Sequence, residues 1–133
     1  MNGCECPWSV RARHRKALTF ESTMCSAHST VGRLMPEFAQ ELQRLIAAAD
    51  RPELVGQVVD LPIVDRCRCG QDNCATFHTA PRPEGAYPPG HDCVMLDPDT
   101  GLVILDLVEN QIVCVEVLDR PDVKELLDQF MPT

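Results

Sequence analysis

The residues with the clearest capacity for chemistry lie in the segment DRCRCGQDNCATFHTA, residues 65–80. It contains three cysteines and one histidine, and its central GQDN is typical of a turn. If residues 70–73 form the loop of a hairpin, three cross-strand pairs result: Cys69 with Cys74, Cys67 with Thr76, and Asp65 with His78. Because side chains alternate along a strand, all six residues then share one face.

This grouping favours a metal site. Three thiolates and an imidazole are a usual ligand set for structural zinc, which they bind with tetrahedral geometry. Two positions along a strand span about 7 Å and four span about 13 Å, so His78 can be too far from the loop to complete the set. The fourth ligand can instead come from GHDC, residues 90–93. We therefore predict a zinc site with these candidate ligands: Cys67, Cys69, Cys74, His78, His91 and Cys93.

Three alternatives stay open for the same hairpin. The thiols can be reduced and bind no metal, or Cys69 and Cys74 can form a redox-active disulfide, since opposed strand residues approach within disulfide range. A catalytic site would use Cys74 as nucleophile and His78 as base, with Asp65 orienting the base. The last reading is weakened because Cys74 and His78 are four positions apart on one strand. The spacing C-x-C-x4-C-x3-H also differs from the C-x2-C of most zinc sites.

Other polar residues have simpler interpretations. Asp97 and Asp99 in LDPDTG suit a tight turn better than a calcium loop. Asp106 and Glu116 lie among apolar strand residues, and a buried carboxylate needs a partner. We expect that partner to be one of three arginines: Arg66, Arg68 or Arg82. In CECPW near the N-terminus, two further thiols can bind metal or donate to the main site: Cys4 and Cys6.

Two amphipathic helices are predicted. The first covers residues 36–49, where apolar residues recur at helical spacing after a proline that suits the first position of a helix. The last begins in DRPDVKELLDQF, residues 119–130. The phrase DRP also opens DRPELVG, residues 50–56, which predicts a short helical turn. In both copies the aspartate, Asp50 or Asp119, is the expected N-cap.

Between the helices the pattern changes to strands. CVMLD, LVILDLV and IVCVEVL, separated by short turns, predict an antiparallel meander. One predicted face carries Val94, Leu96, Val103, Leu105, Leu107, Ile112, Cys114 and Leu118. The other carries Met95, Leu102, Ile104, Val113, Val115 and Val117. Because both faces are apolar, we expect both to be covered, either by the two helices or with one face covered by a second copy of the chain.

The predicted fold is α+β: a small antiparallel sheet, made of the meander and the cysteine hairpin, with an N-terminal and a C-terminal helix. At 133 residues the chain suits one domain. Residues 1–30 lack sustained periodicity and are predicted to be a disordered or loosely packed arm, and residues 31–133 a single α+β domain. Translation can start at Met1 or at Met24.

The segment LDPDTGLVILDLVENQIVCVEVLDRPD, residues 96–122, resembles short bacterial β-rich domains of unknown function. In these domains an acidic turn, a strand, a polar turn and a strand of the type I-x-x-I/V-E recur. The resemblance implies a small meander followed by a helix. It implies no activity, and it does not include the cysteine hairpin.

The charge distribution narrows the functional classes. Residues 1–33 carry five of the twelve Lys and Arg but only two of the twenty Asp and Glu, so the remaining body is strongly acidic. Nucleic-acid binding is therefore not expected. We find neither a membrane-spanning run nor a signal peptide, which favours a cytoplasmic protein with reduced thiols. The expected function is a non-enzymatic zinc-binding protein that binds a protein partner or itself; the alternatives are a thiol- or zinc-dependent enzyme and a thiol redox module.

Overall fold

A computed structural model of the chain describes residues 29–132. The predicted arm, residues 1–30, lies outside this range except for its last two residues. The Ser29 carbonyl accepts a 2.7 Å hydrogen bond from the Ile63 N–H, and Thr30 forms an antiparallel bridge with Pro62. The predicted thiol ligands in residues 1–28 also fall outside the described part. Among the described residues, no helix is both long and apolar enough to cross a membrane.

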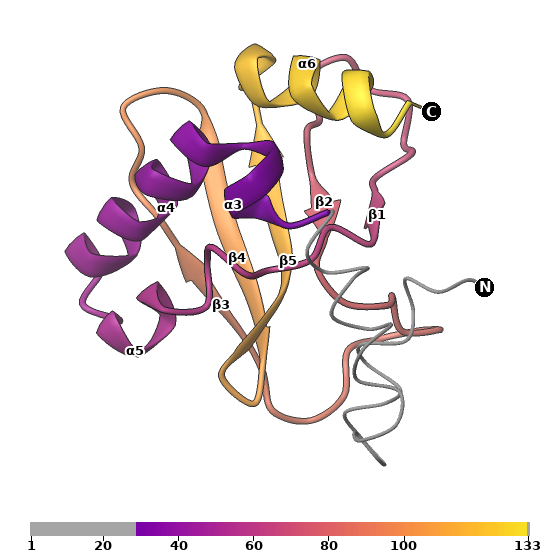
Figure 1. The fold of residues 1–133 in the computed structure, drawn as a ribbon. Coiled ribbons are helices and arrows are strands. Elements are labelled where there is room, and N and C mark those ends of the chain that lie inside the picture. Colours follow the sequence, from indigo (N-terminus) through magenta and orange to yellow (C-terminus); the bar gives the residue numbers. More distant parts are fainter. Residues whose placement is uncertain (1–28, 133) are drawn as a thin grey trace, which may run out of the picture.

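Five strands and four helices follow one another along the described chain (Figure 1). In order they are α3 (Val31–Leu34), α4 (Pro36–Ala48), α5 (Pro52–Val55), β1 (Asp65–Arg66), β2 (Phe77–His78), β3 (His91–Met95), β4 (Leu102–Val108), β5 (Gln111–Leu118) and α6 (Pro121–Phe130). The strands form one antiparallel sheet in the order β1-β2-β5-β4-β3. The predicted α+β fold class is confirmed.

The helices begin at the prolines that the sequence indicated, Pro36, Pro52 and Pro121. Proline suits the first turn because its fixed φ matches the helix and its missing N–H would have no partner there. The buried side of α4 consists of five residues: Phe38, Ala39, Leu42, Leu45 and Ile46. In α6, Val123 and Leu127 are buried in the same core.

The predicted capping by Asp50 and Asp119 is wrong. Both aspartates adopt positive φ, 65° and 58°, a conformation that aspartate tolerates better than most residues. The next residue, Arg51 or Arg120, occupies the N-cap. Its Nε donates to the carboxylate two positions later, at 2.9 Å after Arg51 and 3.0 Å after Arg120. In both copies of the phrase DRP, the N-cap of the helix is therefore an arginine whose side chain pairs with an acidic residue of the first turn.

The meander forms as predicted from β3, β4 and β5, but β5 contains an irregularity. Asp106 lies opposite Cys114, whereas the next residue, Leu107, lies opposite Ile112. Val113 is therefore an extra residue in β5, a β-bulge. Such a bulge changes the face to which all later side chains of the strand point.

Two polar side chains hold this bulge. The Thr79 backbone N–H donates to the Val113 carbonyl at 2.9 Å, and the Thr79 hydroxyl donates to the Ile112 carbonyl at 2.8 Å. The Gln57 amide oxygen accepts from the Ile112 N–H at 2.9 Å, and its Nε2 donates to the Asn110 carbonyl at 2.8 Å. Thr79 is fully buried, so the bonds that it makes satisfy backbone groups that water cannot reach.

The bulge corrects part of the predicted face assignment. Val115 and Val117 lie in the core and not on the opposite face, whereas Cys114 points away from the core beside Asp106, and Leu118 is also outside the core. The other predicted core residues are confirmed as buried in one cluster: Val94, Leu96, Val103, Leu105, Leu107 and Ile112.

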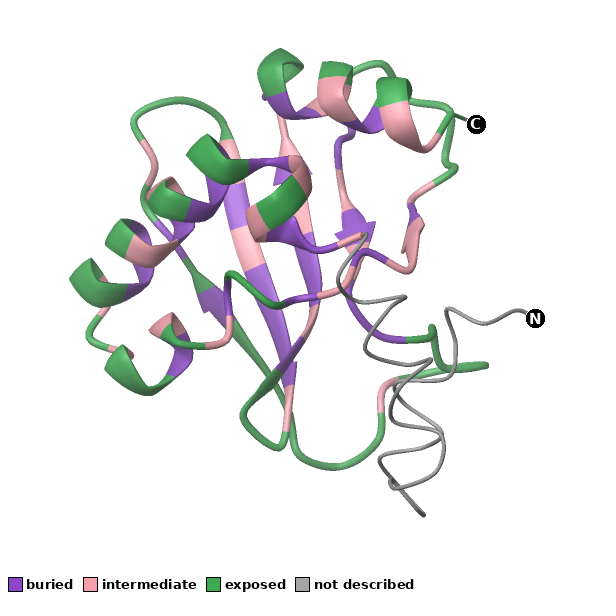
Figure 2. Ribbon diagram, viewed as in Figure 1, coloured by how far each residue is buried: buried purple, intermediate pink, exposed green. Residues whose placement is uncertain are grey.

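The helices α3, α4, α5 and α6 all contribute to this one core, against the same face of the sheet (Figures 1 and 2). The prediction that the two main helices cover both faces is therefore wrong, because Val115 and Val117 make only one face continuously apolar. The opposite face is called the outer face below. Its residues include His78, His91, Cys93, Met95, Ile104, Asp106, Cys114 and Glu116. Met95 on this face is 68% exposed.

We predict that the hydroxyl of Thr79 stabilises the bulge measurably. Thr79→Val keeps the shape of the side chain but leaves the buried Ile112 carbonyl without its donor, so the free energy of unfolding should fall by about 1–3 kcal/mol. Thr79→Ser keeps the hydroxyl and should cost no more than about 1 kcal/mol, the value of one buried methyl group. Urea unfolding followed by circular dichroism measures both; equal losses would show that the hydroxyl does not matter.

Candidate metal centre

The cysteine hairpin has the predicted register at its base. Asp65 lies opposite His78, and the Cys67 N–H donates to the Thr76 carbonyl at 2.9 Å. Beyond this point the ladder stops, since β1 and β2 contain only two residues each. The cysteines therefore lie on a loop anchored by a short hairpin and not on two long strands.

A turn takes the place of the predicted cross-strand pairing of Cys69 with Cys74. The Cys74 N–H donates to the Gln71 carbonyl at 3.2 Å, and Gly70 has a φ of 82°, which a glycine adopts without strain. Cys74 also bridges to Leu118 at the end of β5. The turn brings the Sγ atoms of the three cysteines within 4.8 Å of one another.

The three thiols differ in their exposure. Cys74 is buried, Cys67 is half-buried and Cys69 is exposed. They line a pocket of about 140 Å³ together with residues that include Arg66 and Lys124. The cluster therefore has a fixed inner sulfur and an outer sulfur that solvent reaches, with two cationic side chains along the same pocket.

The surroundings of the hairpin shift the pKa values of two thiols in opposite directions. Hydrogen bonds from the Gln71 backbone N–H and from the thiols of Cys67 and Cys74 lower the pKa of Cys69. Burial raises the pKa of Cys67 to about 11. A cation that binds here displaces the remaining thiol protons, because cysteine binds metals as the thiolate.

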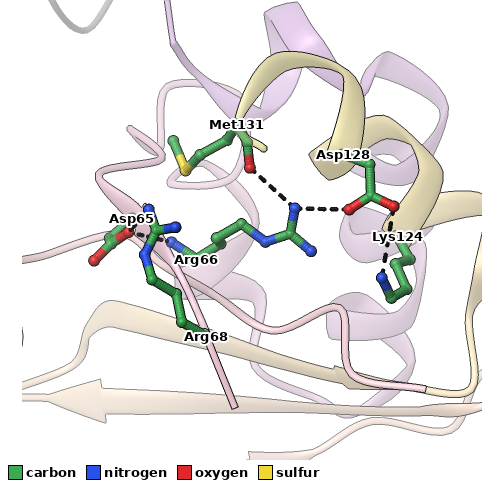
Figure 3. Close-up of polar contacts among 6 residues, drawn as sticks. All are labelled: Asp65, Arg66, Arg68, Lys124, Asp128 and Met131. Atoms are coloured by element: carbon green, nitrogen blue, oxygen red, sulfur yellow. Dashed lines mark hydrogen bonds and ion pairs between the residues drawn. The ribbon is translucent and has the colours of Figure 1, made fainter. Parts of the chain in front are cut away.

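Arg66 fixes the strand that carries the first two cysteines (Figure 3). Its buried side chain points to α6, where Nη1 donates to the Asp128 carboxylate at 2.8 Å and to the Met131 carbonyl at 2.9 Å. Its neighbour Arg68 bonds Asp65 at the surface, at 2.9 Å. The hairpin is thus attached to the last helix through one buried guanidinium.

The structure separates the six predicted ligands. Cys67, Cys69 and Cys74 form the group just described, which we call the thiol triad. His91 and Cys93 lie in a second group with Asp106, whose ligand atoms are also within 4.8 Å of one another. His78 belongs to neither group; it is half-buried and lies opposite Cys114 on β5.

Sequence patterns did not predict which side chains contact Asp106. The expected salt bridge with an arginine is wrong: the carboxylate of Asp106 instead contacts His91 Nε2 at 3.1 Å and accepts a hydrogen bond from the Cys93 thiol at 3.2 Å. Arg66 and Arg68 pair with other acids. The available signal was the meander itself, because its register places Cys93 directly opposite Asp106.

Charge is concentrated around Asp106. A hydrogen bond to the Asp106 carboxylate, with partial burial, raises the pKa of Glu116 to about 7. The same carboxylate raises the pKa of Cys93 to about 11. Burial alone would raise the pKa of Asp106, but hydrogen bonds from Glu116, His91 and Cys93 outweigh it and hold that pKa below its ordinary value.

The fold and the thiol triad together define a small α+β domain with a candidate metal-binding hairpin. Comparisons with protein families, with curated proteins and with solved structures find no match to this chain. The resemblance of residues 96–122 to bacterial β-rich domains therefore stays a prediction.

We predict that Arg66 contributes more to stability than Arg68, although both form ion pairs. Arg66→Ala removes two hydrogen bonds from a buried guanidinium and should lower the free energy of unfolding by about 1–3 kcal/mol. Arg68→Ala, the matched control, removes an exposed pair and should cost less than about 1 kcal/mol. Chemical denaturation of both variants tests this, and a larger loss for Arg68→Ala would contradict it.

Proposed function

We propose that this chain is a non-enzymatic zinc-binding protein in which Cys67, Cys69 and Cys74 bind one structural zinc ion. The observation that carries the proposal is the convergence of three thiol sulfurs within 4.8 Å. Tetrahedral zinc with Zn–S bonds near 2.3 Å needs sulfurs about 3.8 Å apart. A contraction of about 1 Å or less within a loop brings the triad to that spacing.

The hairpin gives such an ion a structural role. Only two residue pairs join β1 to β2, and a two-stranded hairpin of that length is marginal on its own. A zinc ion would link residues on both sides of the turn and hold the loop closed. Binding free energy at a site of this kind contributes directly to folding.

The fourth coordination position supports a role in protein interaction. Within the described residues, neither His78, His91 nor Cys93 lies close enough to all three sulfurs to join the group. The exposed position of Cys69 leaves that side of an ion open to water or to a side chain of a protein partner. A compartment that keeps thiols reduced, such as the cytosol, would keep the triad available for metal.

We predict that the full chain, purified under reducing conditions, contains zinc bound by the triad. Thiol titration should find that Cys67, Cys69 and Cys74 react only after chelation, and chelation should lower the melting temperature. Cys69→Ser should weaken zinc binding roughly 100-fold or more, since loss of an outer-shell partner alone costs about 10- to 100-fold. Cys114→Ala, a substitution of a buried thiol outside the triad, should keep both the affinity and the protected thiols.

Two results would contradict the proposal. The first is a chain without zinc in which Cys67, Cys69 and Cys74 react as readily before chelation as after it. The second is a disulfide within the triad that forms and breaks reversibly without unfolding, which would favour the thiol redox module. The same titration in a background with Cys4 and Cys6 replaced by serine shows whether the N-terminal thiols supply the fourth ligand.

A further inference from the structure

We propose that His91, Cys93 and Asp106 form a second site for a divalent transition-metal ion, independent of the thiol triad. The site lies on the outer face where the edge strand β3 pairs with β4. Its three side chains offer one nitrogen, one sulfur and one oxygen, all within 4.8 Å of one another. No other function described above uses these residues.

Strand geometry explains why these three residues meet. Cys93 lies directly opposite Asp106 in the β3–β4 register, and opposed side chains on antiparallel strands are close neighbours. His91 is two positions before Cys93 on β3, so it points to the same face. The His91 Nε2 lies 3.1 Å from the Asp106 carboxylate and 3.9 Å from the Cys93 sulfur.

Burial of Asp106 points to a cation as the missing component. Asp106 is 4% exposed, and burying a carboxylate costs free energy unless the carboxylate is paired. Among the described residues, neither lysine nor arginine forms a salt bridge with it, and His91 is its one ion-pair partner there. The Glu116 carboxyl, from β5, adds a second acidic group beside it. A divalent ion bound by the three ligands would neutralise this charge.

The proline-rich loop between β2 and β3, residues 79–90, supplies a positioning residue. The ring of Tyr87 stacks on the ring of His91, with centroids 4.3 Å apart and an interplanar angle of 11°. This contact restricts the rotation of the imidazole and keeps Nε2 directed at Asp106. Metal sites depend on such outer contacts to orient their histidine ligands. Tyr87 therefore extends the site from the sheet to the loop that connects β2 with β3.

The ligand types define the class of metal. Imidazole, thiolate and carboxylate together suit Zn²⁺ and similar borderline ions and not Mg²⁺ or Ca²⁺, which prefer oxygen ligands alone. Both His91 and Cys93 are exposed, so an ion here would be reachable by solvent. The sulfur-only triad and this mixed set differ enough in chemistry to be distinguished spectroscopically.

Titration with Co²⁺, which replaces Zn²⁺ and absorbs light, tests the second site in the full chain. The background variant replaces six thiols with serine: Cys4, Cys6, Cys25, Cys67, Cys69 and Cys74. We expect it to bind one Co²⁺ with a thiolate-to-cobalt charge-transfer band. The band should disappear on the further change Cys93→Ser. Cys114→Ala, the matched control on the neighbouring strand, should leave it unchanged.

A second measurement covers the case in which the background variant fails to fold. In the otherwise wild-type chain, His91→Gln and Cys93→Ser should each reduce the Zn²⁺ stoichiometry from two to one. If both variants still bind as much Zn²⁺ as the wild type, the second site does not exist. If only the thiol triad fails to bind metal, the wild type binds one Zn²⁺ ion. His91→Gln then loses that ion, and Cys69→Ser retains it.

Discussion

The arrangement of the whole sheet depends on one extra residue, Val113, and on the hydrogen bonds that hold it. After Ile112 the bulge reverses the face of the sheet to which each β5 side chain points, so Val115 and Val117 point into the core. A bulge leaves backbone groups outside the regular ladder, and Thr79 and Gln57 bond three of those nearby: the Ile112 N–H and carbonyl, and the Val113 carbonyl. Without these contacts the displaced backbone would be buried without partners, at a cost comparable to several hydrogen bonds.

The same constraint divides the sheet into a packed face and an outer face that carries ionisable side chains. Because all four described helices cover the face that carries Val115 and Val117, the outer face is left to the polar and sulfur-containing side chains. Cys114 and Glu116 lie there, beside Asp106 of β4, as a direct result of the register after the bulge. Thr79 follows His78 at the end of the hairpin, so the contact that fixes the bulge also joins β2 to β5.

Sequence patterns predicted which segments form helices and strands better than they predicted the face of the sheet on which each strand residue lies. The helices starting at Pro36 and Pro121, the turn between β4 and β5, and the pairing of Asp65 with His78 all follow from local signals: proline position, turn residues and strand alternation. The bulge was not predictable, because Ile112, Val113, Cys114 and Val115 are all apolar and a shift by one residue leaves that pattern unchanged. Similarly, Asp50 and Asp119 precede helices as N-caps often do, but both adopt positive φ and the arginine after each one occupies the N-cap.

The sequence indicated which residues are candidate ligands, but not which of them lie close enough together to share an ion. Spacing along the chain linked His91 and Cys93 to the hairpin cysteines, since all belong to one cysteine- and histidine-rich region. The sheet instead pairs them with Asp106, thirteen residues beyond Cys93, because β3 reaches β4 through a short turn and never pairs with β2. Strand order therefore decides which ligands can share an ion. The order β1-β2-β5-β4-β3 places the hairpin at one edge and β3 at the other, which favours two separate sites of different chemistry over one complete four-ligand site.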